Sequence, residues 1–361
     1  MKNTIDWRFP LTINATMTRM KRGKRSGGVI KSMQTLSKVE NLFTVINETA
    51  ELLSKDLQIT YIEAVAETGE NLFQNAILQE ELSEVTIKSL QRKYDSLHIQ
   101  SYDKESLRKG YQLAILKGLK DGAHPNHQMT PDTIGLFMGY LMNKFLTDKK
   151  QLSILDPAVG TGNLLTTILN YLSKETIESY GVDVDDLLIR HAYINANLQE
   201  HPINFYNQDS LERLLIDPVD AVVCDLPVGY YPNDVEAARY ELKSDEGYSY
   251  SHHLFMEQSL NHTKEEGYLF FIVPNSLFET KEAPKLNEYL RSTAIIQAFV
   301  KLPASLFKDE RHGKSILVLQ KKGEHTVAPK QALLADLPKF SNKQAMNSIM
   351  KQMDDWFKEN K

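Results

Sequence analysis

The chain has 361 residues, 42% of them hydrophobic, which is long enough for two domains with packed cores. It contains no run of eighteen apolar residues, and this excludes a membrane-spanning helix. A single cysteine, Cys224, excludes an intramolecular disulfide framework and a cysteine-rich zinc site, and it predicts a cytoplasmic location.

The net charge of −5 is unevenly distributed along the chain. Residues 1–32 contain eight Lys/Arg and one acid, a charge of +7, so residues 33–361 carry −12. Nucleic-acid affinity depends largely on neutralising phosphates with lysine and arginine. The acidic body therefore argues against a nucleic-acid protein that works through bulk charge alone.

Residues 1–32 are expected to form a basic, disordered extension. They lack the apolar segment of a secretory signal, and a transit peptide or a nucleic-acid-binding arm are the alternatives. The tract Arg25-Ser26-Gly27-Gly28 is compatible with purine-rich codons that resemble a ribosome-binding site. Our hypothesis is that native translation starts at Met33, which a native mass beginning earlier would contradict.

Residues 33–122 are predicted to form a helical bundle domain. From Lys38 to Asp121 proline is absent, and stretches such as "VENLFTVINETAELLSK" place apolar residues three and four positions apart. We expect roughly four helices, ending where Gly, Pro and polar residues cluster in "KDGAHPNHQ". The pattern favours a packing or dimerisation domain, so a homodimer through this domain is a possible assembly.

Residues 123–325 have a different pattern, in which short β-rich runs alternate with helical stretches. This alternation predicts a Rossmann-like α/β fold, a doubly wound and mostly parallel sheet of seven strands. The last run follows its predecessor too closely for an intervening helix, so it is expected to be antiparallel. Residues 326–361 are predicted to be a strand and helix extension that packs on this domain. The predicted strands are "LSIL", "IESYGVDV", "INFYN", "DAVVCDL", "GYLFFIVP", "AIIQAFVKL" and "KSILVLQKK".

The glycine turn "DPAVGTGNLL" follows the first predicted strand. It lacks the P-loop spacing, and Leu165 stands where a dinucleotide fingerprint needs its third glycine. Asp156 can accept hydrogen bonds from a cationic amine, and Asp183 at the end of the second strand can bind both hydroxyls of a ribose. Together the two acids and the glycine turn favour S-adenosylmethionine over NAD as the ligand. The alternative is a purely structural role, in which the acid caps the turn after a strand.

At this point the chain resembles a family. "DPAVGTGNLL", "YGVDVDD", "NQDSL" and "VCDLPVGYY" occur in the order of the class I S-adenosylmethionine-dependent methyltransferases. "HQMTPDTIGLFMGYL" is similar to the corresponding segment of adenine-specific DNA methylases, and "GYLFFIVPNSLF" and "VKLPASLFKDERHGKSILVLQKK" resemble the modification subunits of type I restriction systems. The chain also resembles the small YtxK-like group of bacterial proteins. The resemblance covers roughly residues 120–325.

The resemblance implies which residues bind the cofactor. The turn would be formed by Asp156, Ala158, Gly160 and Gly162, with Asp183 on the ribose. Asp209 would lie beside the adenine ring, or else cap a helix in "SLERLL". Thr130 would close on the methionine end of the cofactor, and with Pro131 it also predicts an N-cap and first-turn pair.

The segment "CDLPVGYYP" stands where the amino-methylating families carry Asn/Asp-Pro-Pro-Tyr/Phe. A side-chain oxygen and a backbone carbonyl there would accept the hydrogens of a conjugated amine, and an aromatic ring would stack on the extruded base. Asp225 and Pro227 keep their positions, whereas Leu226 replaces the first proline and Val228 the aromatic residue. Tyr230 or Tyr231 would then supply the ring, and a scaffold that has lost catalysis is the alternative.

The resemblance implies nucleic acid, in first place DNA, as the acceptor, with a partner chain for target recognition. A glutamine amide in protein, RNA, or a non-catalytic cofactor-binding scaffold are the other readings.

Several other side chains have structural interpretations. Cys224 is expected in the core, Asp185 and Asp186 in a first helical turn, and the pair His252 and His253 at a helix start. The loop from Gly229 to Ser251 is expected to be a substrate lid. No metal site is predicted, because His and Cys do not occur at metal-ligand spacing.

Overall fold

The structure is a computed structural model that describes residues 27–121 and 129–361. Most of the predicted basic extension, residues 1–26, and the junction 122–128 lie outside the described residues. Residues 27–32, which were expected to belong to that extension, are part of the first helix.

The amino-terminal part of the chain is helical, as its periodicity predicts. It contains α1 (Gly27–Leu57), α2 (Tyr61–Gln74), α3 (Glu84–Asp95), a short 3₁₀ turn η1 (Ile99–Ser101) and α4 (Lys104–Asp121). Thr60 and Glu63 form a capping box that starts α2, and Asn75 in the left-handed conformation ends it. Leu42, Ile46 and Leu53 on one face of α1 are fully buried in the shared core.

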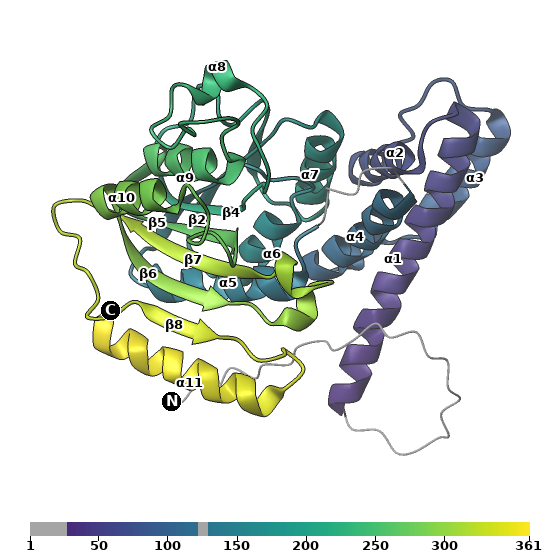
Figure 1. Cartoon of the computed structure of the whole chain (residues 1–361). Helices are drawn as coiled ribbons and strands as arrows, with labels where there is room; N and C mark the ends of the chain where they lie inside the picture. The colour runs from purple at the N-terminus through teal and green to yellow at the C-terminus, as the bar shows by residue number, and fades with distance from the viewer. Residues whose placement is uncertain (1–26, 122–128) are drawn as a thin grey trace.

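A single mixed sheet follows, with the order β3-β2-β1-β4-β5-β7-β6-β8 (Figure 1). Strands β1 to β5 run parallel to one another, and β7 is antiparallel to both β5 and β6, as expected for the last β-rich run. The strands are β1 (Gln151–Asp156), β2 (Thr176–Asp183), β3 (Ile203–Asn207), β4 (Val219–Asp225), β5 (Thr263–Pro274), β6 (Ala294–Lys301), β7 (Lys314–Lys321) and β8 (Leu333–Asp336).

The seven predicted strands all form, and the sheet has an eighth. The additional strand, β8, comes from the carboxyl-terminal extension and pairs in parallel with β6. It is followed by α11 (Lys343–Asn360), whose buried side chains Met346, Met353 and Phe357 face inward. Strand β8 therefore extends the sheet beyond β6, and α11 covers it. Without β8, β6 would present an open edge.

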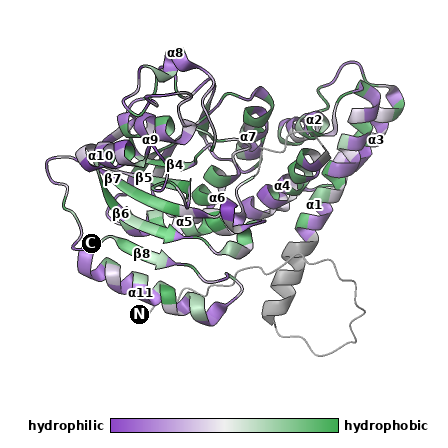
Figure 2. Ribbon diagram, in the orientation of Figure 1, coloured by the Kyte–Doolittle hydropathy of each residue, from purple (hydrophilic) through white to green (hydrophobic). Residues whose placement is uncertain are grey.

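Helices cover both faces of the sheet, which is the doubly wound arrangement (Figure 1). One core cluster joins the sheet to α5 (Asp132–Phe145), α6 (Asn163–Tyr171) and α11, and the other joins it to α9 (Ser251–Asn261) and α10 (Ala283–Thr293). Figure 2 shows the consequence, since the central strands are almost continuously hydrophobic.

The helical part packs against α7 (Asp186–Leu198), the helix between β2 and β3. Ile194 and Leu198 of α7 belong to the helical core, and Arg190 forms ion pairs with Glu67 and Glu70 of α2 at 2.7 Å. Within residues 27–121 and 129–361, none of the helices combines the length and apolarity needed to cross a membrane.

Candidate active site

A cavity of about 300 Å³ opens at the carboxyl edge of the sheet, beside the ends of β1, β2 and β4. The chain reverses its winding between β1 and β4, and such switch points are where open α/β sheets bind ligands. Six predicted site residues line the cavity: Ala158, Gly160, Asp183, Asp209, Asp225 and Pro227. Four others, Thr130, Asp156, Gly162 and Tyr230, do not line it.

Asp156 ends β1 and lies immediately behind the lining, with its side chain 1% exposed. It accepts a hydrogen bond from the Ala158 N–H at 3.1 Å. Burial raises the pKa of this carboxyl to about 8, and the negative charges of Asp183 and Asp225 add to the effect. A buried acid held in this way gains most from a cationic ligand that restores its charge.

The glycine turn needs two residues in the left-handed region. Gly160 has φ of +53° and Gly162 has φ of +75°. A Cβ on Gly162 would meet Ala192 of α7 at 3.1 Å, so this glycine permits close helix packing. A Cβ on Gly160 would meet nothing within 4 Å, and since Gly160 lines the cavity, its open side is available to a ligand.

Asp183 ends β2 and fixes the turn from the side. One carboxylate oxygen accepts the Gly160 N–H at 2.7 Å and the other accepts the Asp185 N–H at 3.0 Å. A carboxylate held in this way at the end of the second strand is the kind of group that binds the adjacent hydroxyls of a ribose.

Asp209 lines the cavity, but the helix considered for "SLERLL" does not form. Its side chain instead accepts the Leu211 N–H at 2.9 Å, closing a tight turn, and the Tyr231 hydroxyl at 2.6 Å. Tyr231 is thereby buried as a support for Asp209, so that Tyr230 is the exposed ring of the pair Tyr230 and Tyr231.

Thr130 was expected to cap α5, and this prediction was wrong. The N-cap is Pro131 and makes no side-chain cap bond. The Thr130 hydroxyl donates instead to Asp225 at 2.9 Å, because it faces the end of β4. The other oxygen of Asp225 accepts from Lys314 Nζ at 2.6 Å, a contact that was not predicted from the sequence.

The loop after β4 departs from the family pattern in a defined way. Leu226 is 1% exposed and Pro227 lines the cavity, whereas Val228 points to the surface. Tyr230 is 62% exposed and stacks on Tyr250 at 5.0 Å with the rings 17° apart.

The segment from Gly229 to Ser251 is closed at its base. Tyr230 and Tyr250 form a β-bridge, the Tyr231 N–H donates to the Ser249 carbonyl, and the Ser251 N–H donates to the Gly229 carbonyl. The first strand of this base follows Asp225 at the end of β4, and the second leads directly into α9.

A buried arginine of the helical part reaches the same site. Arg108 of α4 has a fully buried side chain, forms ion pairs with Glu105 and Asp132, and donates to the Asn163 amide oxygen at 2.6 Å. Asn163, the first residue of α6, donates in turn to the Thr130 carbonyl at 2.9 Å. Only the three-dimensional arrangement reveals this network, because its members lie on separate helices.

The structural interpretations of Cys224, of Asp185 and Asp186, and of the pair His252 and His253 are confirmed. Cys224 is fully buried, and burial raises the pKa of its thiol. Asp185 caps α7 by accepting the Leu188 N–H, with Asp186 in the first turn. His252 and His253 lie in the first turn of α9. Among the described residues no group of three or more His, Cys, Asp or Glu side chains is arranged to hold a metal.

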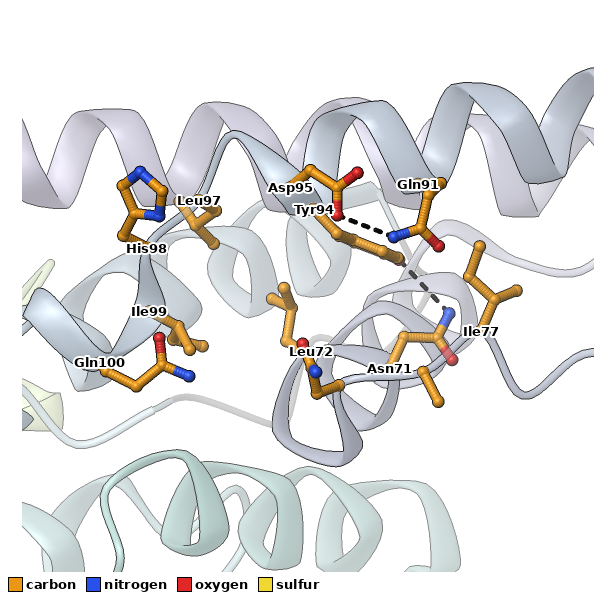
Figure 3. Close-up of a pocket in the computed structure, with 12 residues that line it drawn as sticks. Asn71, Leu72, Ile77, Gln91, Tyr94, Asp95, Leu97, His98, Ile99 and Gln100 are labelled. Carbon is orange, nitrogen blue, oxygen red and sulfur yellow. Dashed lines mark hydrogen bonds between the residues drawn. The ribbon is translucent and has the colours of Figure 1, made fainter.

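A second cavity, of about 190 Å³, lies within the helical part (Figure 3). Leu72, Leu97 and Ile99 form apolar parts of its wall, while Tyr94 accepts from the Asn71 amide and Asp95 accepts from Gln91. These two pairs hold four of its polar side chains, and it shares no lining residue with the cavity beside Asp183. The chemistry described here therefore belongs to the cavity at the sheet edge.

Two family profiles match the chain. The one described as N-6 DNA Methylase matches residues 124–360, and the one described as YtxK N-terminal helical domain matches residues 40–119. Protein YtxK of Bacillus subtilis (strain 168) is 54% identical over 321 residues, 89% of this chain and 98% of the relative. The type II methyltransferase M.HincII of Haemophilus influenzae is 27% identical over 203 residues, which span 53% of this chain and 35% of that protein.

Solved structures agree with the fold. A candidate class I S-adenosylmethionine-dependent methyltransferase from Listeria monocytogenes is 45% identical and aligns with a TM-score of 0.83, covering 89% of this chain and 99% of its own. A type I restriction-modification methyltransferase subunit from Streptococcus thermophilus is 17% identical with a TM-score of 0.62, covering 87% and 73%. At that identity the second likeness shows the fold alone.

Proposed function

Since the chain belongs to the N-6 DNA methylase family, we propose that it is an S-adenosylmethionine-dependent N-methyltransferase whose acceptor is an exocyclic amino group, that of adenine in DNA. The observation that carries this proposal is the convergence of Asp183, Gly160 and Asp225 on one cavity, with the buried Asp156 directly behind it. These groups come from three different strand ends, and each matches one part of the cofactor or the acceptor.

The cofactor supplies a methyl group on a positively charged sulfur. Asp156 would hold the ammonium group of the cofactor, and Asp183 would hold its ribose hydroxyls. The open side of Gly160 would let the cofactor lie close to the backbone of the turn. Asp209 would lie near the base, with its carboxylate oriented by Tyr231. This assignment uses the chain's own acceptors and requires no metal.

Asp225 and the carbonyl of Leu226 would accept the two hydrogens of the acceptor amine and so localise its lone pair toward the methyl group. The N–C bond forms as the C–S bond breaks, sulfur keeps the bonding pair, and the nitrogen then releases one proton to water. Most of the rate would come from alignment in a dry cavity. Pro227 stiffens the loop, and the exposed Tyr230 is the ring available to stack on an extruded base.

Recognition of a DNA sequence is proposed to come from a partner chain. Residues 33–361 carry a charge of −12, and the type I restriction-modification protein of Streptococcus thermophilus is itself described as a subunit. A homodimer through the helical part would be a second way to complete the assembly.

The test is methyl transfer from labelled cofactor, with unmethylated DNA, RNA and cell extract as separate acceptors. We expect N6-methyladenine in DNA, and we expect Asp225→Ala to abolish transfer while micromolar cofactor binding by calorimetry persists. Asp186→Ala, which removes an exposed acid outside the cavity, is the matched control and should transfer normally. Retained transfer in Asp225→Ala would remove that residue from the mechanism.

A glutamine amide in a basic protein is the second candidate acceptor. The segment from Gly229 to Ser251 carries five acidic side chains near its tyrosines, which repel phosphates and suit a cationic partner. Label incorporated into protein and absent from DNA would establish it. Cofactor binding without label in any acceptor would instead identify a non-catalytic scaffold.

A further inference from the structure

The carboxylate of Asp225 is balanced by a cation that is not part of the cavity wall. Lys314 Nζ lies 2.6 Å from one Asp225 oxygen, and the Thr130 hydroxyl lies 2.9 Å from the other. Asp225 lines the cavity and Lys314 does not. The lysine and carboxylate side chains are 29% and 21% exposed, so this pair is only partly screened by water.

The direction of β7 explains how Lys314 reaches this place. Strand β7 runs antiparallel to β5, so its first residue, Lys314, pairs with Pro274 at the carboxyl end of β5. Asp225 is opposite Ile272 on the neighbouring strand β4. A parallel β7 would have placed its amino end at the opposite edge of the sheet.

We propose that Lys314 is a positioning residue that neutralises Asp225. The amine to be methylated then meets a hydrogen-bond acceptor whose net charge is nearly zero. This inference rests on the proposed function of the cavity. Each oxygen of Asp225 has accepted one hydrogen bond and keeps another acceptor position for the amine. The Asp225–Lys314 pair thus does what a neutral asparagine does at the same position.

The need for balance follows from the charges around the cavity. Asp183, Asp209 and Asp225 line it and Asp156 lies behind it. A further uncompensated carboxylate would bind the positively charged cofactor more tightly before the reaction. During transfer the positive charge passes from sulfur to the acceptor nitrogen, so after transfer the cofactor product is uncharged. An uncompensated Asp225 would therefore add affinity for the charged cofactor over its uncharged product, and Lys314 limits that preference.

The experiment compares the affinities of S-adenosylmethionine and S-adenosylhomocysteine, which differ by the sulfonium charge, and it needs no acceptor. We expect Lys314→Met to raise the ratio of the two affinities in favour of S-adenosylmethionine about 3- to 10-fold. Asp225→Asn should lower the ratio, and the double variant should return it to within about twofold of the starting protein. Lys314→Arg keeps the positive charge, so it should keep the affinity ratio of the starting protein.

Lys308→Met, which removes an exposed lysine from the preceding loop, is the control for general charge effects. Thermal unfolding of every variant identifies any that fail to fold. A ratio unchanged in both single variants, or a change in Lys314→Met that persists in the double variant, overturns the proposal. Failure of the proposed function is distinguishable, because it would appear as absent methyl transfer while the affinity ratios still followed the double-mutant cycle.

Discussion

Asp156 illustrates how a single residue in this protein is placed for binding at a cost in stability. Its carboxyl is fully enclosed at the end of a hydrophobic strand, and burial raises its pKa to about 8. The Ala158 N–H is the hydrogen bond it receives from the backbone, at 3.1 Å. A core position chosen for stability alone would carry an apolar side chain there, so the acid indicates a ligand with a positive charge.

The pH dependence of stability tests this interpretation. The folded-state pKa of Asp156 is raised from its ordinary value of 3.8 to about 8, so between these values the folded protein binds more protons than the unfolded chain. The contribution of Asp156 to the free energy of unfolding therefore falls as pH rises from about 4 to about 8. Asp156→Asn, which still accepts the Ala158 N–H, should remove this decline.

We expect Asp156→Asn to gain stability relative to the starting protein at pH 8 and to gain little at pH 4, as measured by urea unfolding across that range. The same variant should lose most of its affinity for S-adenosylmethionine. A parallel stability profile for both proteins would show that Asp156 does not carry the shifted titration.

At the scale of elements, the site is held by hydrogen bonds between helices that are distant in sequence. Arg108 of α4 joins Asp132 at the start of α5 to Asn163 at the start of α6. Asn163 continues the connection to the Thr130 carbonyl, and the Thr130 hydroxyl contacts Asp225. The helical part is therefore connected to both the glycine turn and the loop after β4 through a chain of three contacts.

Removal of Arg108 should affect stability and binding together. Arg108→Met leaves Glu105 and Asp132 without their buried partner, which typically costs about 3–5 kcal/mol. We also expect weaker cofactor affinity, since the start of α6 and the Thr130 segment lose their common anchor. Chemical unfolding and calorimetry measure the two effects.

The neighbouring Lys109 provides the control for this prediction. It contacts Glu105 at 3.1 Å from a partly exposed position, and such pairs contribute about 0–1 kcal/mol. Lys109→Met should therefore change neither quantity much. Equal losses of stability and cofactor affinity in the two variants would indicate that the helix needs positive charge in general. They would contradict a specific role for the Arg108 network.

At the scale of the whole molecule, the distribution of charge limits what the chain does alone. Residues 33–361 carry −12 in total, and the basic residues of 1–32 lie almost entirely outside the described residues. DNA affinity falls with salt in proportion to the number of phosphates that are neutralised. A body of this charge can neutralise few phosphates.

We expect residues 33–361 alone to bind duplex DNA weakly, with a slope of log affinity against log salt shallower than about −2. Fluorescence anisotropy between 50 and 200 mM salt would measure it, with addition of a candidate partner chain as the second arm. A steep slope for the isolated protein would show that it carries its own DNA-binding surface and would remove the reason for a partner.

Local features of the sequence were sufficient for much of this structure. Every β-rich run became a strand, and the apolar spacing of residues 38–121 became helices, because burial of a strand or a helix face leaves a periodic pattern in the chain. The turn glycines, Gly160 and Gly162, were also identifiable, since glycine adopts their left-handed backbone conformation at no steric cost. The acids that end β1, β2 and β4 followed from the parallel topology.

Contacts between distant segments were decided only by the tertiary structure. The sequence could not indicate that Thr130 gives its hydroxyl to Asp225 instead of a helix end, or that Tyr231 supports Asp209 while Tyr230 stays exposed. Lys314 and Arg108 left no sequence signal either, because their roles depend on strand direction and on the packing of separate helices. Hydrophobic periodicity reports burial along one element, whereas the partner of a polar side chain depends on which elements the fold brings next to it.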